Sequence, residues 1–444
     1  MEENYLLTTP WARKLYEAVR GLPLIDYHNH LNVRDIRENR RFRDIYELWL
    51  ASDPYKHRVM RICGIDEALI TGSAGAKEKF RAFCGVYPRL MGGPLYDWCR
   101  MELGGVLGIR TPILPENADR IWDEAAEKLA GEDFRAGNLL RRFGAEYTAP
   151  CAGVLDDLSF FDPDQGVVPS LRGDDMAHPT ADFISRLEKL SGKAQESLDA
   201  YIDALAGRMR SFHALGCRFS DHALDDGFAF APCRDGTDAL YRRARAGERI
   251  PAAEQQTLTS EVLLRLMRQY QKLGWSVQLH IGALRRTSTR LRAAAGPAGG
   301  FAGIGSDLSM AALSAFLDAA EQAAGKLPRI ILYTLNPAYN AAFAILSGSF
   351  VGVTQGPAWW WCDHLQGMRE MLERFSVYSV LSAFPGMTTD SRSLLSMSRH
   401  GYFRRMLCGW LGEKMEKGEM PRDMEAMKEL AIRLCYQNAK DRTI

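Results

Sequence analysis

Short apolar or β-branched runs alternate with amphipathic helical stretches along most of the chain. The first run covers residues 22–27 and predicts a short buried strand. Similar runs predict seven further strands, at residues 145–148, 167–171, 217–220, 276–281, 329–335, 350–354 and 380–384. Apolar residues at helical spacing predict helices between several of these strands, most clearly at residues 194–215, 258–273, 310–324 and 366–375. A further helix is expected to start at Thr9, whose hydroxyl suits an N-cap and is followed by Pro10.

This alternation indicates the fold class. Strands that alternate with helices form parallel sheets, and eight such units predict an α/β fold of the (β/α)8 barrel type. A doubly wound open sheet is the alternative architecture. We disfavour that alternative because no Gly-x-Gly-x-x-Gly motif follows the first predicted strand.

Two segments do not follow the alternation. Residues 33–143 are polar and helical in pattern and too long for one loop, which predicts a helical insertion after the first strand. Residues 398–444 are rich in Arg, Met and Leu at helical spacing, which predicts a C-terminal helical cover. We therefore expect a single barrel domain over residues 1–444.

Composition and charge narrow the classes of binding partner that we expect. Hydrophobic residues make up 46% and charged residues 25% of the chain, as in soluble globular proteins. Lys and Arg number 56 and Asp and Glu 55, so the net charge is near zero. A chain with no overall basic field is not expected to gather nucleic acid or an anionic membrane surface.

The termini and the cysteines indicate where the protein works. The N-terminus has no basic region followed by an apolar one, so it is not expected to be a signal peptide. No apolar stretch approaches the roughly 20 residues that a membrane helix needs. The nine cysteines occur singly and without a Cys-x-x-Cys motif, which is typical of reduced thiols. These features predict a cytoplasmic protein.

Polar residues follow nearly every predicted strand, where the active sites of barrels lie. His28 and His30 end the first strand, and side chains two residues apart on a strand point to the same face. Asp390 follows the eighth strand, which neighbours the first in a closed barrel. Two nitrogens and one oxygen suit Zn²⁺ or a similar divalent ion, and three ligands leave positions open for substrate or water.

The remaining strand ends predict an anionic substrate. Each residue alone has a plainer reading: Asp221 can cap a helix, His280 can be a core histidine and Trp359 can serve packing. Taken together, arginines beside a metal suit a small, oxygen-rich anion, because a guanidinium group forms bidentate hydrogen bonds with a carboxylate. The residues in question are Arg172, Asp221, His280, Arg285, Trp359 and Arg392.

Several longer motifs resemble a known family. The sequence Ile-Asp-Tyr-His-Asn-His-Leu at residues 25–31 resembles the first strand of uronate isomerases (glucuronate isomerases), which belong to the amidohydrolase superfamily. Residues 216–222 and 278–283 are similar to later strands of that family. The most specific match is Gly-Met-Thr-Thr-Asp-Ser-Arg-Ser at 386–393, followed by Arg-His-Gly-Tyr-Phe-Arg-Arg at 399–405. The resemblance runs nearly end to end.

The resemblance implies a fold, a reaction and a site. The fold is a (β/α)8 barrel, and the reaction interconverts D-glucuronate with D-fructuronate and D-galacturonate with D-tagaturonate. The implied metal ligands are His28, His30 and Asp390, with Zn²⁺ the expected ion. The implied catalytic residues are Asp390, Tyr55, His280 and Asp221, and the implied substrate-binding residues are Arg172, Arg285, Trp359 and Arg392. A sugar acid is the expected ligand, and a homo-oligomer is the expected assembly.

Two departures from the family pattern bear on the substrate. The family usually has His before the tyrosine of the insertion, whereas Pro54 precedes Tyr55 here. After the second strand the family usually reads Thr-Asp-Asp-Pro, whereas this chain has Thr-Ala-Pro-Cys at 148–151. Losing an imidazole and two carboxylates near the pocket mouth leaves open an altered rate, an altered substrate range or a divergent activity on a related sugar acid.

Two rival functions and one mechanistic choice also stay open. A metal-dependent hydrolase would use the same barrel, with His280 as a further ligand. A non-catalytic descendant would bind sugar acids without converting them. Within the isomerase reading, a base that carries the C2 proton to C1 through a cis-enediol competes with a direct hydride shift.

Overall fold

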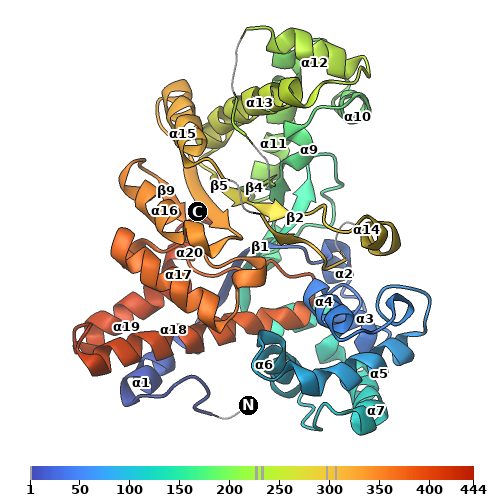
Figure 1. Ribbon diagram of the computed structural model, residues 1–444, viewed down its shortest axis with the longest axis vertical. Coiled ribbons are helices and arrows are strands. Elements are labelled where there is room, and N and C mark those ends of the chain that lie inside the picture. The colour runs from blue at the N-terminus through green and yellow to red at the C-terminus, as the bar shows by residue number, and fades with distance from the viewer. Residues whose placement is uncertain (1–2, 226–228, 232–234, 297–298, 306–307) are drawn as a thin grey trace.

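The computed structural model describes residues 3–225, 229–231, 235–296, 299–305 and 308–444. Seven parallel strands form one curled sheet, and helices surround it (Figure 1). The order in the sheet is β1 (Leu24–Asn29), β2 (Ala145–Gly153), β3 (Ser170–Arg172), β4 (Phe219–Leu224), β5 (Ser276–Ile281), β8 (Arg329–Thr334) and β9 (Val353–Gln355). The predicted α/β barrel is confirmed.

The eighth predicted strand is wrong. Residues 380–384 contain a 3-10 turn, Leu381–Ala383, and Val380 is exposed. Phe384 is buried against Phe375 and Phe403, so the apolar run serves packing between helices and not a sheet. An apolar run of five residues fits either role, because periodicity does not distinguish them.

The segment that follows takes the place of the eighth strand. The backbone N–H of Asp390 donates to the carbonyl of His28 at 3.0 Å, and that of His30 donates to the carbonyl of Ser391 at 2.8 Å. The hydroxyl of Thr388 accepts from the N–H of His28 at 2.9 Å. Residues 388–391 therefore lie directly beside the end of β1.

The other seven predicted strands are present in the structure, but their observed ends differ from the predicted ones. β4 was expected to stop at residue 220 but continues through Asp221 and His222, and β2 continues past Pro150. Asp221 and His222 can continue the strand because hydrogen bonds to the neighbouring strands satisfy their backbone N–H and C=O groups. The prediction missed a small antiparallel pair, β6 (Ala283–Leu284) and β7 (Gly303–Ile304), which is too short to show a pattern.

Seven α-helices lie between β1 and β2 and gather on one side of the barrel, in blue and teal in Figure 1. They are short, and polar caps begin several of them: Asn32, Asp44 and Asp53 each accept backbone N–H groups at a helix start. The helices are α2 (Val33–Arg37), α3 (Ile45–Trp49), α4 (Pro54–Ile62), α5 (Ala76–Val86), α6 (Pro94–Arg100), α7 (Ala118–Ala130) and α8 (Ala136–Arg142).

The remaining helices cover the barrel and join the two ends of the chain. Thr9 caps the first helix as predicted, and that helix packs against the long helix near the C-terminus. These helices are α1 (Pro10–Val19), α9 (Asp174–Ala177), α10 (Ala181–Ser191), α11 (Leu198–Ala214), α12 (Thr237–Arg245), α13 (Ala252–Leu273), α14 (Thr289–Ala295), α15 (Met310–Ala324), α16 (Asn340–Ile345), α17 (Leu365–Tyr378), α18 (Ser398–Lys417), α19 (Met424–Ile432) and α20 (Asn438–Lys440). In the part of the chain that the structure describes, no helix is long and apolar enough to cross a bilayer.

A candidate metal centre at the strand ends

One cavity of about 530 Å³ opens at the carboxyl ends of the strands. All ten site residues expected from the sequence line it, although they come from both ends of the chain and from the insertion. They are His28, His30, Tyr55, Arg172, Asp221, His280, Arg285, Trp359, Asp390 and Arg392. The structure thus brings the predicted set together, and the role of each residue stays a prediction.

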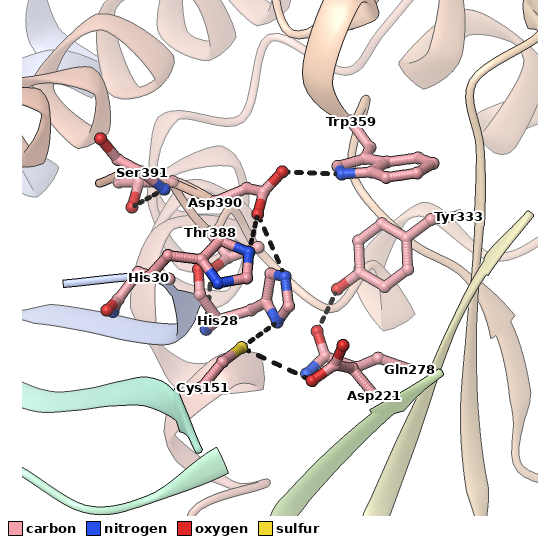
Figure 2. A network of polar contacts seen from close by, with 12 residues as sticks. His28, His30, Cys151, Asp221, Gln278, Tyr333, Trp359, Thr388, Asp390 and Ser391 are labelled. Carbon is pink, nitrogen blue, oxygen red and sulfur yellow. Dashed lines mark hydrogen bonds and ion pairs between the residues drawn. The ribbon is translucent and has the colours of Figure 1, made fainter. Parts of the chain in front are cut away.

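Asp390 joins the histidine pair. Its Oδ1 lies 3.2 Å from Nε2 of His28 and 3.1 Å from Nε2 of His30 (Figure 2). Its Oδ2 accepts the indole N–H of Trp359 at 2.8 Å. Burial raises the pKa of this carboxyl, but the two imidazoles outweigh burial and hold the pKa well below its usual value. Asp390 is therefore a carboxylate aimed at both imidazoles.

The backbone at Asp390 is strained. Its φ of +48° lies in the left-handed region, which non-glycine residues rarely adopt. The bond from its N–H to His28 and the bond from Trp359 to its side chain hold it there. Such strain is typical of functional sites, where surrounding contacts fix a costly conformation.

Further donors surround His28. One donor atom each of His28, His30 and Cys151 lie within 4.8 Å of one another, and the same holds for His28, Asp221 and His280. Nε2 of His280 is buried and has no hydrogen-bond partner among the described residues. Nitrogen, oxygen and sulfur atoms gathered in this way, one of them unsatisfied, fit a divalent metal ion.

Asp26 holds the layer beneath the site. It is fully buried on β1, and its carboxylate accepts the N–H of Thr389 at 2.7 Å, the hydroxyl of Thr389 at 2.8 Å and the amide of Asn29 at 2.8 Å. Nε2 of His400 lies 3.2 Å away. Asp26 thus ties the segment of Asp390 to β1. This role of Asp26 was not predicted, although a charged residue within an apolar strand was a signal for it.

The three arginines have different surroundings. Nε of Arg172 donates to Asp174 at 2.9 Å, and Nε of Arg285 donates to Asp225 at 2.7 Å. Arg392 is exposed and makes no hydrogen bond or ion pair with any residue that the structure describes. Each guanidinium therefore keeps nitrogens available to an anion in the cavity.

Tyr55 belongs to a second cluster of buried polar side chains, which also contains Asp363 and Arg399. Its hydroxyl donates to Oδ2 of Asp363 at 2.9 Å, and Nη1 of Arg399 donates to the same oxygen at 3.2 Å. The Arg399 guanidinium lies 4.6 Å from the centre of the Tyr55 ring. Burial raises the pKa of Asp363 to about 7, against the opposing effect of Arg399. Asp363 and Arg399 were not predicted to belong to the site, although Arg399 opens one of the motifs that resemble the family.

The two departures from the family pattern both lie near the site. Pro54 is the first residue of α4 and lines the cavity directly before Tyr55. Cys151 lies on β2, where its sulfur contacts His28. The ring of Pro54 thus stands where the family usually has an imidazole. Ala149 and Pro150, directly before Cys151, stand where the family usually has two carboxylates.

Fold and site together define a class. The protein is an α/β barrel whose strand ends carry a donor set for a divalent metal ion beside arginines, as in barrel enzymes that act on small anions. A sequence profile of the glucuronate isomerase family matches residues 1–442, and the chain belongs to that family. The predicted family and the prediction of an enzyme are confirmed.

Individual relatives agree over the full length. The uronate isomerase of Caldanaerobacter subterraneus subsp. tengcongensis is 37% identical, covering 99% of this chain and 98% of its own. That of Caldicellulosiruptor saccharolyticus is 38% identical with the same coverage. The crystal structure of uronate isomerase from Thermotoga maritima superimposes with a TM-score of 0.94 at 31% identity, covering 100% of this chain and 99% of that one.

Proposed function

We propose that this protein interconverts D-glucuronate with D-fructuronate and D-galacturonate with D-tagaturonate. The observation that carries the proposal is the full-length family match combined with one cavity that holds every expected site residue. The names of the relatives favour isomerisation over the hydrolase alternative.

Zn²⁺ is the proposed metal, held by His28, His30 and Asp390. Two imidazoles and one carboxylate are a ligand set that zinc commonly takes in catalytic sites. When bound, the ion supplies a positive charge that polarises a substrate oxygen.

The arginines bind the sugar carboxylate in this proposal. Arg392 makes no hydrogen bond or ion pair with any of the described residues, so its guanidinium can pair with an anion. Arg172 and Arg285 are each fixed through one nitrogen by Asp174 and Asp225, which orients the rest of the guanidinium. Trp359 packs beside the ligand position.

Proton transfer falls to Tyr55, Asp221, His280 and Asp390. Burial raises the pKa of Tyr55 far above its usual value, so its phenol keeps a proton that it can donate to a substrate oxygen. Burial and the neighbouring His28 lower the pKa of His280, so its imidazole is neutral and able to accept a proton. Burial raises the pKa of Asp221 above its usual value, against the opposing effects of His28 and Arg172, so this carboxylate accepts a proton more readily than an exposed one. Asp390 faces the same oxygens as a carboxylate.

The decisive experiment is a turnover assay with glucuronate and galacturonate in separate reactions. The purified protein is stripped of metal by a chelator and then assayed with and without added zinc. We expect ketose to form from a uronate, and to form faster with zinc. Release of an acid from an ester or lactone without ketose would instead establish the hydrolase, and binding of a uronate without ketose would establish the non-catalytic descendant.

A labelled substrate separates the two routes of isomerisation. We propose the cis-enediol route, in which a protein base exchanges the C2 proton with solvent during some turnovers. Uronate deuterated at C2 should therefore lose part of its label to water as it reacts. Complete retention of deuterium at C1 of the product would count against the enediol route.

We propose a homo-oligomer in the cytoplasm and a single barrel domain, with the insertion at 33–143 and the cover at 398–444. Sedimentation velocity measures the first of these, and limited proteolysis tests the domain division, because separate domains release stable fragments.

A further inference from the structure

Cys151 connects two residues of the cavity. In the sheet, Pro150 of β2 pairs with Asn29 of β1, so their chain neighbours Cys151 and His28 lie on adjacent strands close to this pair. The sulfur of Cys151 lies 3.5 Å from Nδ1 of His28 and 3.5 Å from Oδ1 of Asp221 (Figure 2). Strands β1, β2 and β4 thus contribute one continuous chain of polar contacts at the strand ends.

The direction of these hydrogen bonds follows from their chemistry. Asp221 offers only acceptors when ionised, so the thiol donates its S–H to Oδ1. The sulfur then accepts the N–H at Nδ1 of His28. The other ring nitrogen of His28, Nε2, faces Asp390 and is the one in position for a metal. A partner at Nδ1 fixes the tautomer that leaves Nε2 free to bind a metal.

Cys151 differs from the other cysteines that the structure describes. The sulfur of Cys217 donates to the carbonyl of Phe219, and that of Cys362 to the carbonyl of Leu335, so both serve the backbone. Cys84, Cys99 and Cys408 lie in the hydrophobic core. Only Cys151, among these, has two cavity-lining side chains as partners, and it is not itself among the residues lining the cavity.

A second observation marks the same place. Nε2 of His280 is buried without a hydrogen-bond partner among the described residues, and the ring centre of His280 lies 4.6 Å from that of His28. His280 is 4% exposed, so water does not readily satisfy this nitrogen. The unsatisfied atom indicates that a ligand belongs between these side chains.

We propose that Cys151 is a positioning residue of the metal centre, which orients His28 through Nδ1 and Asp221 through Oδ1 without binding the metal itself. The proposal rests on the metal site of the proposed function. It assigns a task to the thiol that directly follows Ala149 and Pro150, the two positions where relatives usually have carboxylates. Groups behind a metal-binding histidine commonly change metal affinity by about 10–100-fold when they are removed.

Metal affinity tests the proposal independently of turnover. Metal-free wild type and variants compete with a chromophoric chelator for zinc. C151A and C151V remove both hydrogen bonds, and we expect each to bind zinc about 10–100-fold more weakly. C151S keeps a donor and an acceptor, so we expect it to bind more tightly than either. C217A, which removes a buried thiol whose partner is a backbone carbonyl, should bind as wild type does.

Cobalt(II) distinguishes a positioning role from direct ligation. A thiolate bound to cobalt gives an intense sulfur-to-metal absorption in the near ultraviolet. We expect the cobalt-loaded wild type to lack this absorption and C151A to show a shifted ligand-field spectrum. An intense absorption that disappears in C151A overturns the positioning role in favour of a direct ligand.

The remaining outcomes are equally decisive. Equal zinc affinity in wild type and C151V overturns the proposal. Valine fills the space of the thiol without making its hydrogen bonds, so C151V serves as the test if C151A fails to fold. A wild type with no zinc affinity overturns it as well. If the variants bind zinc more weakly than wild type but wild type forms no ketose, the proposed function is refuted. The role of Cys151 at the metal centre is then still supported.

Discussion

At the scale of single residues, Asp390 is the group on which the site most depends. Its carboxylate contacts His28, His30 and Trp359. D390N replaces one oxygen with an amide nitrogen and removes the charge, so it should abolish turnover and weaken zinc binding by more than the roughly 10–100-fold typical of an indirect partner. The chelator competition and the uronate assay measure both effects.

Asp164 supplies the control for that substitution. It is exposed and does not line the cavity, so D164N should leave both measurements unchanged. Turnover by D390N at a rate near that of wild type would remove Asp390 from the catalytic site.

Asp363 should make stability depend on pH. Burial raises its pKa in the folded protein to about 7, whereas the unfolded chain has the ordinary value near 4. Between these values the folded protein holds more protons than the unfolded chain, so stability falls as pH rises. The contribution is fully present below about pH 4 and is lost as pH passes about 7.

Comparison with D363N isolates this effect. We expect the free energy of unfolding of wild type, relative to D363N, to fall by on the order of 1 kcal/mol per pH unit between pH 5 and 7. Urea unfolding at several pH values measures it. A constant difference across this range would show that Asp363 keeps an ordinary pKa beside Arg399.

At the scale of elements, α18 approaches α1 through glycines. A Cβ at Gly412 would lie 2.5 Å from the backbone N of Ala12 and 2.7 Å from Oγ1 of Thr9. G412A should therefore push α1 away and lower the free energy of unfolding by about 1–3 kcal/mol, although alanine favours a helix. Urea unfolding measures the loss, and zinc affinity should not change.

Gly85 is the matched control because it also lies within a helix, α5, but a Cβ there would meet nothing within 4 Å. G85A should raise the free energy of unfolding by about 0.5–1 kcal/mol through its helix preference. If G412A were stabilising in the same way, the close packing of α1 on α18 would be refuted.

The elements also show how far the sequence carries a prediction. Alternation located seven strands of the barrel, because buried parallel strands are continuous apolar runs. It failed at the eighth position, where the segment before Asp390 contains Pro385 and Gly386 and has no strand pattern. Asp390 was still placed correctly beside His28, because the resemblance of residues 386–393 to the family motif implies that position without relying on the strand.

Contacts between side chains that lie far apart in the sequence could not be predicted from the sequence. Tyr55 was expected in the site, but Asp363 lies 308 residues further along, and only the folded chain brings their side chains together. The same holds for Asp26 with Thr389. Local patterns report which face a residue takes, and they carry no information on which distant partner it meets.

At the scale of the whole molecule, the site joins the two ends of the chain. His28 and His30 follow the first strand, and Asp390 lies near the C-terminal helices. The helix contact between α1 and α18 ties the same two regions together on the outside of the barrel (Figure 1). A metal bound by all three side chains therefore links segments that only the folded protein brings together.

Metal removal should consequently lower thermal stability. A ligand that binds only the folded protein stabilises it by about 2.7 kcal/mol when its free concentration is 100 times its dissociation constant. For a chain of 444 residues this corresponds to a rise in Tm of about 3 °C. Calorimetry with zinc and with excess chelator measures the shift. D390N should show little of this Tm shift, because it lacks the carboxylate that residue 390 would contribute to the metal site. An equal shift in D390N would mean that zinc stabilises the protein from another place, and no shift in wild type would mean that the cavity does not hold zinc.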